Sequence, residues 1–135
     1  MGGETPQDAD YRFVAVRRPG YVYASVTGEN TVANVRRILG DVLAACAEHA
    51  CSRVLLEEHL TGPSLGTIDA FELVSEGSQT ARAAVQQIAY VDTNPEHDSA
   101  LHEFIETVAV NRGVRIRVFP TVAQAAAWLD SLPPR

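Results

Sequence analysis

The stretch from Val114 to Leu132 constrains the fold more than any other part of the sequence, because it reads as a strand, a cap and a helix in succession. Residues 114–119 alternate between aliphatic side chains and arginine or phenylalanine, which is the two-residue period of a β-strand. Thr121 is a favourable N-cap, and Gln124 stands where a capping box has its second member. The apolar residues that follow have helical spacing: Val122, Ala125, Ala126 and Leu129. A strand that runs directly into a capped amphipathic helix predicts an α/β domain.

Upstream of this ending, apolar runs with strand character alternate with segments of helical spacing. The predicted strands are residues 11–17, 21–27, 52–57, 87–91 and 114–119. The predicted helices are residues 32–49 and three further helices that begin at Thr67, at Thr93 or Asn94, and after Thr121. A Pro-Gly turn at residues 18–21 joins the first two strands into an antiparallel hairpin, and right-handed crossovers make the other strands parallel. We therefore expect an α/β single-domain sandwich: a five-stranded mixed, mostly parallel sheet with four main helices, in the order ββαβαβαβα.

Three local features refine this expectation. Residues 54–56 form an apolar run without alternation, which is typical of a strand covered on both faces. Arg115 and Arg117 lie on one side of the last strand and suit a position at the edge of the sheet. Gly77 is expected to weaken or end the second helix.

Composition bounds the domain and its partners. The 135 residues suffice for one domain, which we assign to residues 11–132, and we expect the polar residues 1–10 to form a disordered tail. A net charge of −6 argues against a nucleic-acid partner, because phosphate binding needs a basic surface. No apolar run reaches the length of a membrane span and no secretory signal is visible, so we expect a cytoplasmic protein. Cys46 and Cys51 are expected to be reduced thiols, and no motif indicates a cofactor.

Four short segments mark the transitions between these elements: Val26-Thr-Gly28, Val54-Leu-Leu56, Ile88-Ala-Tyr-Val91, and Val118-Phe119 followed by Ala125–Leu129. Their order and spacing over residues 11–132 resemble the STAS family of anti-sigma factor antagonist-like domains, in its stand-alone single-domain branch. The resemblance implies a non-catalytic regulatory or binding module whose partner is a protein or a small apolar or anionic ligand. The sequence does not fix the oligomeric state, and a homodimer is compatible with it.

The resemblance also draws attention to the segment after the third strand. Phosphorylated members of the family carry the pattern Asp-Ser-Ser-Gly-Leu-Gly there, and residues 61–67 of this chain read Thr-Gly-Pro-Ser-Leu-Gly-Thr. Leu65 and Gly66 match the pattern, and Ser64 is the nearest hydroxyl, while the preceding Asp-Ser pair is absent. The resemblance therefore makes Ser64 a candidate phosphorylation site, as a lesser variant of the binding function.

Ligands of open α/β sheets bind beyond the carboxyl ends of the parallel strands. Polar side chains are frequent after the third and fourth strands, and Phe119, Pro120 and Thr121 follow the fifth, so we expect these three segments to form one rim. The predicted binding surface comprises Glu58, His59, Leu60, Thr61, Ser64, Leu65, Thr67, Phe71 and Asn94. Ser64 and Thr67 adjoin a helix N-terminus, where free amides favour a phosphate or another anion, although an ordinary cap is the simpler role for such residues.

Two other functions stay open at this point. One is a carrier of an apolar or lipid-like ligand, seated between the second helix and the sheet. Phe71, Leu73 and Val74 occupy neighbouring positions of that helix and cannot all face one way, so an exposed apolar patch is one outcome and burial against the sheet is the other. The second alternative is a small metal-dependent enzyme that uses His59 and His97.

The metal alternative has a weak basis in the sequence. Glu58, His59, Asp92 and His97 have side chains that bind divalent metals, but they come from two segments without a metal-binding spacing, and solvated polar residues explain them more simply. No serine or cysteine has the Gly-x-Ser-x-Gly context of an activated nucleophile. We therefore assign no metal ligand and no catalytic residue, and we expect His102 to be a surface residue of its helix.

Overall fold

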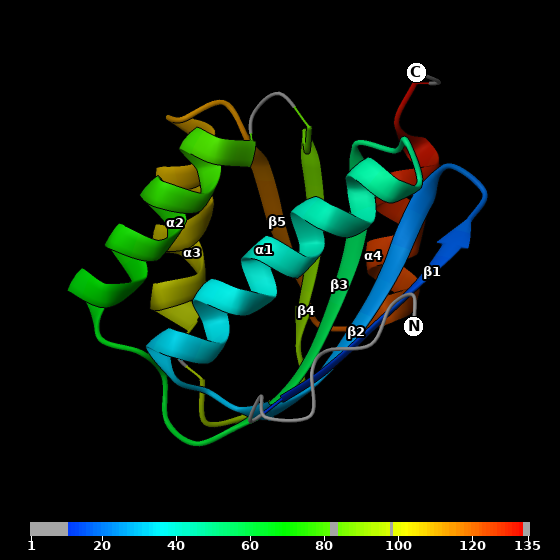
Figure 1. The fold of residues 1–135 in the computed structure, drawn as a ribbon. Coiled ribbons are helices and arrows are strands. Elements are labelled where there is room, and N and C mark those ends of the chain that lie inside the picture. The colour runs from blue at the N-terminus through cyan, green and yellow to red at the C-terminus, as the bar shows by residue number, and fades with distance from the viewer. Residues whose placement is uncertain (1–10, 82–83, 98, 134–135) are drawn as a thin grey trace.

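Five strands form one mixed sheet with helices on both faces, as the sequence predicts (Figure 1). The computed structural model describes residues 11–81, 84–97 and 99–133, so the expected disordered tail at residues 1–10 lies outside the described part. The strands are β1 Tyr11–Arg18, β2 Tyr21–Glu29, β3 Arg53–Thr61, β4 Gln87–Asp92 and β5 Arg115–Phe119. The helices are α1 Val32–Glu48, α2 Thr67–Ala81, α3 Ser99–Val110 and α4 Val122–Ser131.

The strands lie in the sheet in their chain order, β1-β2-β3-β4-β5. β1 is antiparallel to β2, and every other neighbouring pair is parallel. Because successive right-handed crossovers advance in the same direction, α1, α2 and α3 all lie on one face, and α4 alone covers the other (Figure 1). α2 packs mainly against α1 and α3 rather than on the strands. This stacking leaves space between α2 and the sheet.

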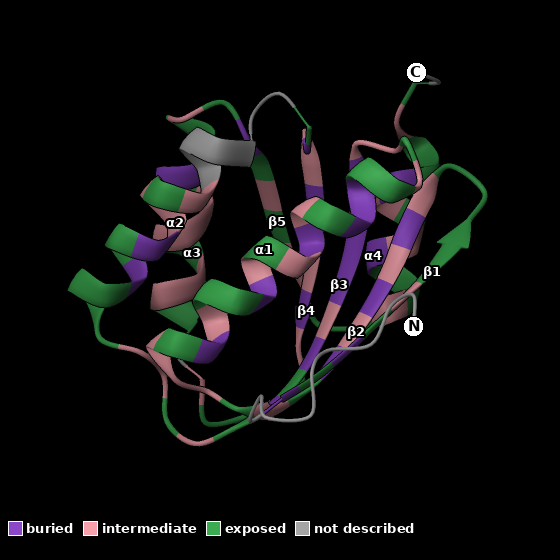
Figure 2. Ribbon diagram, viewed as in Figure 1, coloured by how far each residue is buried: buried purple, intermediate pink, exposed green. Residues whose placement is uncertain are grey.

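β3 is buried on both faces, which confirms the interpretation of its apolar run. Val54 and Leu56 belong to the core beneath α1, whereas Leu55 belongs to a second core beneath α4. Figure 2 shows buried residues along β2, β3 and β4 and on the inner side of α1. Trp128 and Phe119 close the second core at its edge, with ring centroids 5.6 Å apart.

Three predicted boundaries are wrong, each for a tertiary reason. β3 continues to Thr61 because β2 pairs with it along its whole length, so residues 58–61 are strand rather than loop. α2 continues past Gly77, where a Cβ would lie 3.2 Å from Leu39 Cδ1 of α1; this glycine permits a close helix contact instead of ending the helix. α3 begins only at Ser99, because the Asn94 side chain holds the preceding segment in a turn by accepting from Glu96 N at 2.9 Å.

The expected edge strand and thiols are found as predicted. β5 lies at the edge of the sheet with Arg115 and Arg117 exposed, and the Arg117 guanidinium covers the Trp128 ring at 5.7 Å. Cys46 and Cys51 are both free thiols. None of the helices in the described ranges has the length and apolar character needed to cross a bilayer.

Candidate functional site

The segments after β3 and β4 lie side by side at the carboxyl ends of the strands. Asn94 Nδ2 donates to the carbonyl oxygens of Leu60 at 2.9 Å and Gly62 at 3.1 Å. His97 Nε2 lies 3.0 Å from the same Gly62 oxygen. Two segments of the predicted rim are therefore adjacent, and side chains from the segment after β4 hold them together.

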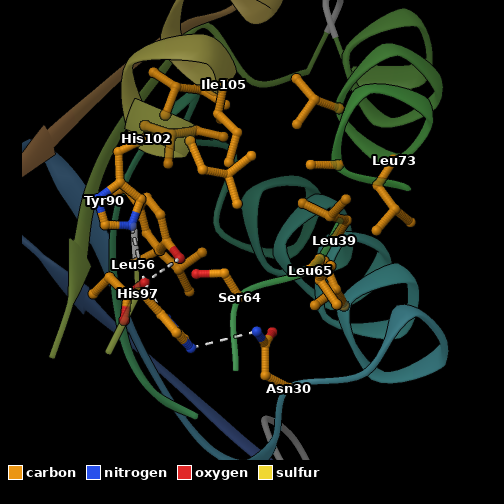
Figure 3. A pocket seen from close by; sticks show the side chains of 17 residues that line it. Asn30, Leu39, Leu56, Ser64, Leu65, Leu73, Tyr90, His97, His102 and Ile105 are labelled. Carbon is orange, nitrogen blue, oxygen red and sulfur yellow. Dashed lines mark hydrogen bonds and ion pairs between the residues drawn. The ribbon is translucent and has the colours of Figure 1, made fainter. Parts of the chain in front are cut away.

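A cavity of about 100 Å³ opens beside this rim, in the space between α2 and the sheet (Figure 3). Its apolar lining comes from all three helices of this face, from the strands and from the segment after β3: Val35, Leu39, Leu56, Leu65, Ala70, Leu73, Val74, Ile88, Leu101, Ile105 and Ile116. Its polar lining gathers at one end: Asn30, Ser64, Tyr90, Asp92, His97 and His102. The cavity thus joins an apolar body to a polar end.

Asp92 organises the polar end. Its Oδ2 lies 2.5 Å from His97 Nδ1 and 3.0 Å from His102 Nε2, and its Oδ1 accepts from Asn94 N at 3.1 Å. The Asp92 side chain is only 2% exposed. Burial by itself raises the pKa of this carboxyl, but the hydrogen bonds from His102 and His97 outweigh burial and hold the pKa below its ordinary value. Asp92 therefore stays ionised and fixes both imidazole rings.

A second buried carboxyl adjoins Asp92. Glu58 is 6% exposed and accepts a hydrogen bond from Tyr90 Oη, which lies 3.4 Å from Asp92 Oδ2. Burial raises the pKa of Glu58 to about 7; the hydrogen bond from Tyr90 lowers it and the nearby charge of Asp92 raises it. Burial also raises the pKa of Tyr90 well above its ordinary value. The carboxyl of Glu58 is therefore poised to gain or lose a proton near neutral pH, while Tyr90 remains protonated.

Strand alternation separates the residues that the metal alternative would combine. Glu58 faces the side covered by α1, α2 and α3, whereas Glu57 and His59 face the side on which α4 lies. There His59 Nε2 lies 3.0 Å from Glu57 Oε2 and His59 Nδ1 lies 3.0 Å from Thr93 Oγ1. The His59 side chain is 43% exposed. Within the described ranges, no three His, Cys, Asp or Glu side chains converge as metal ligands do. The set Glu58, His59, Asp92 and His97 is therefore not one site.

The other residues of the predicted binding surface differ in where they lie and how far they are exposed. The prediction that Leu60 belongs to the binding surface is wrong, because its side chain is 2% exposed and lies in the core. Ser64 and Leu65 line the cavity. Thr67 begins α2 and is exposed. Thr61 is exposed and donates from its hydroxyl to the carbonyl oxygen of residue 28 at 3.2 Å.

Phe71 lies on the exposed side of α2 and is 40% exposed. Its ring contacts Phe104 of α3, with centroids 6.3 Å apart, and the Arg112 guanidinium lies 5.1 Å from the ring centre. Leu73 is buried and Val74 is half-buried, so α2 divides its apolar residues between the core and the surface.

Three polar residues of the cavity lining were not predicted from the sequence: Asn30, Tyr90 and His102. Tyr90 precedes Asp92 by two strand positions, so the two-residue period was a usable signal that they share a face. His102 was expected on the surface, which is wrong: it precedes Ile105 by three positions, a spacing that places both on one face of α3. For Asn30 no local signal exists, because its donation to the Pro63 carbonyl at 2.8 Å joins segments far apart in the sequence.

Comparison with known proteins adds information on the fold alone. No protein-family model matches the sequence, and no curated protein is significantly similar to it. Among solved structures, the chain is similar to the crystal structure of an anti-sigma factor antagonist from Mycobacterium paratuberculosis, with a TM-score of 0.53 and 13% sequence identity. The alignment covers 94% of this chain and 99% of that chain. The protein therefore has the STAS-like fold of an anti-sigma factor antagonist.

Proposed function

We propose that the protein is a non-catalytic regulatory module that binds a protein partner through the segment after β3 and the first turns of α2. The structurally similar protein is named as an anti-sigma factor antagonist, and a protein of that description acts on another protein. Fold similarity alone does not fix function, so the case depends on the surface itself.

The observation that carries the proposal is apolar exposure at the start of α2. Ile68 is 74% exposed and Phe71 is 40% exposed, beside the exposed Thr67 and the half-buried Leu65. Apolar side chains that gather on a surface with polar neighbours are typical of an interaction site. The partner that fits this surface is a protein with an apolar groove that receives the Phe71 ring.

Affinity capture with the purified protein as bait tests this proposal. Phe71→Asp places a charge in the proposed interface, and the matched control is Val14→Asp, which charges an exposed valine on the opposite face of the sheet. We expect the same specific protein to be recovered by the wild type and by Val14→Asp, and to be lost with Phe71→Asp. Equal recovery by Phe71→Asp, with circular dichroism showing a folded bait, would place the interface elsewhere.

Phosphorylation of Ser64 is a lesser variant of this function. A phosphate on Ser64 would add about two negative charges to a cavity end that already holds Asp92, with His97 and His102 as the nearby groups able to compensate. We expect such a modification to displace the segment after β3 and so to change partner binding. Phosphopeptide mass spectrometry of the protein purified from its own host tests whether Ser64 carries the group.

A second candidate function is small-ligand binding, and the cavity beneath α2 specifically favours it. Its body is apolar, its polar groups gather at one end, and it lies at the position between α2 and the sheet where a carried ligand would sit. An empty apolar cavity of roughly 150 Å³ in another protein binds benzene, so this volume suits a small organic molecule rather than a long lipid chain. Native mass spectrometry of the purified protein tests for a co-purified ligand.

A further inference from the structure

The two sides of the cavity differ in their chemistry. Figure 3 shows Leu39 and Leu73 on one side and Tyr90, His97 and His102 on the other. A ligand that fills this space has to place apolar groups against the helices and a polar group against the strand end. Such a division selects for an amphipathic molecule, and the polar side decides which head group it carries.

Several hydrogen-bond donors of the polar side are already used within the protein. Tyr90 donates its hydroxyl proton to Glu58. A carboxylate only accepts, so the nitrogens of His97 and His102 that face Asp92, at 2.5 and 3.0 Å, are both donors to it.

Asn30 follows the same pattern at the rim. Its amide nitrogen donates one hydrogen to the Pro63 carbonyl oxygen at 2.8 Å and lies 3.4 Å from His97 Nε2, and its amide oxygen can accept a hydrogen bond. Acceptor lone pairs remain on the Tyr90 hydroxyl, on the Asn30 amide oxygen and on Asp92 Oδ1, which accepts a hydrogen bond from Asn94 N. A head group that donates hydrogen bonds therefore meets several acceptors at this end.

We propose that the cavity binds a small organic cation, with its apolar body beneath α2 and a protonated primary amine facing Asp92 and Tyr90. The inference rests on the second proposed function, small-ligand binding, and specifies the ligand class. An ammonium group offers three donors and a positive charge, and Asp92 is the ionised group that lines the cavity. A carboxylate head would instead meet the charge of Asp92 and the lone pairs of Tyr90.

Three probes with the same six-carbon body test the head group: n-hexylammonium, 1-hexanol and hexanoate. Each is titrated into the wild-type protein at pH 7.5 and constant ionic strength, with binding followed through backbone amide shifts in NMR spectra. We expect n-hexylammonium to bind about tenfold more tightly than 1-hexanol, because charge-assisted hydrogen bonds are stronger than neutral ones, and hexanoate to bind most weakly. The amides of Leu73 and His102, on opposite walls of the cavity, should shift together.

The outcomes separate the inference from the function on which it rests. Equal or tighter binding of 1-hexanol or hexanoate would overturn the amine assignment and leave small-ligand binding intact. Binding of none of the three would overturn both. Shifts confined to the outer surface of α2 would also count against the cavity as the site.

Substitutions test whether the probes bind in the cavity beneath α2. Asp92→Asn should abolish the preference for n-hexylammonium while 1-hexanol still binds. Retained binding of 1-hexanol shows that the cavity is still formed. Ala70→Leu fills the apolar end and should weaken every probe that binds, whereas Val110→Ala, at an exposed position of α3, should leave all affinities unchanged. A preserved preference in Asp92→Asn would overturn the assignment of Asp92 to the head group. If Asp92→Asn does not fold, the three-probe comparison on the wild type still decides the question.

Discussion

Glu57 and Glu58 are neighbours on β3, yet they belong to two tyrosine–glutamate networks on opposite faces of the sheet. Tyr23 of β2 donates to Glu57, and Tyr90 of β4 donates to Glu58. A histidine completes the first network directly, since His59 lies 3.0 Å from Glu57. The second network reaches its histidines through Asp92.

The two networks differ in how completely helices cover them. α1, α2 and α3 enclose the Glu58 network, whereas on the other face α4 packs over β3, β4 and β5 and leaves His59 exposed. Two networks of similar side chains therefore contribute differently to the free energy of unfolding, because one is more deeply buried than the other. Exposed polar pairs contribute at most about 1 kcal/mol, while breaking a buried charged network costs several times more.

The largest expected effect comes from Asp92→Asn. This substitution removes the charge that pairs with two enclosed histidines, and we expect it to lower the free energy of unfolding by about 3 to 5 kcal/mol. The control is Glu57→Gln in the less buried network, which should change the free energy of unfolding by less than about 1 kcal/mol. Urea unfolding of both variants measures the contrast, and equal losses would remove the distinction between the two faces.

The pH dependence of the free energy of unfolding in Glu58→Gln tests whether burial raises the pKa of Glu58. The pKa of Glu58 is about 7 in the folded protein and 4.5 as its ordinary value, so the folded state holds a proton that the unfolded state releases between these pH values. Stability from this group is therefore greatest below pH 4.5 and falls as the pH rises to about 7. We expect Glu58→Gln to stabilise the protein by about 3 kcal/mol at pH 8 and by less than about 1 kcal/mol at pH 5. A difference independent of pH would show that Glu58 titrates normally.

Removal of each tyrosine hydroxyl gives the smallest and most direct comparison. Tyr90→Phe leaves the buried Glu58 carboxyl without its donor, and we expect a loss of about 1 to 3 kcal/mol together with a higher pKa of Glu58. Tyr23→Phe should cost less than about 1 kcal/mol, because Glu57 keeps His59 as a partner. NMR titration of the Glu58 side chain in Tyr90→Phe measures the pKa directly; a lower value would contradict the assigned hydrogen bond.

Much of the fold was predictable because its signals are local. The Thr121 cap is confirmed: its side chain accepts from Gln124 N at 3.2 Å. The Gln124 side chain lies 3.3 Å from the Thr121 hydroxyl, so the two residues of the predicted capping box are in contact. The uninterrupted apolar run of β3 likewise predicted burial on both faces, since one strand has only two faces to bury.

The candidate site was predictable only in part. The rim followed from the parallel strands, whose carboxyl ends meet at one edge of the sheet. The directions of the side chains on the rim could not be predicted in the same way. The sequence predicts that the third strand ends at residue 57, whereas β3 continues to Thr61, and strand alternation over residues 58–61 decides which face each side chain joins. Leu60 consequently belongs to the core, and His59 lies on the opposite face from Glu58.

The order of the elements, the hairpin and the parallel crossovers are all encoded locally, because periodicity and turn residues act over a few positions at a time. The packing of the layers decides that α2 rests on α1 and α3, that a cavity remains beneath it, and that Tyr90 and Asp92 share its polar end, with Glu58 hydrogen-bonded to Tyr90. These features depend on contacts between segments more than thirty residues apart, such as Tyr90 with Glu58. No local pattern encodes which of two neighbouring glutamates the helices will cover, since burial is a property of the assembled layers.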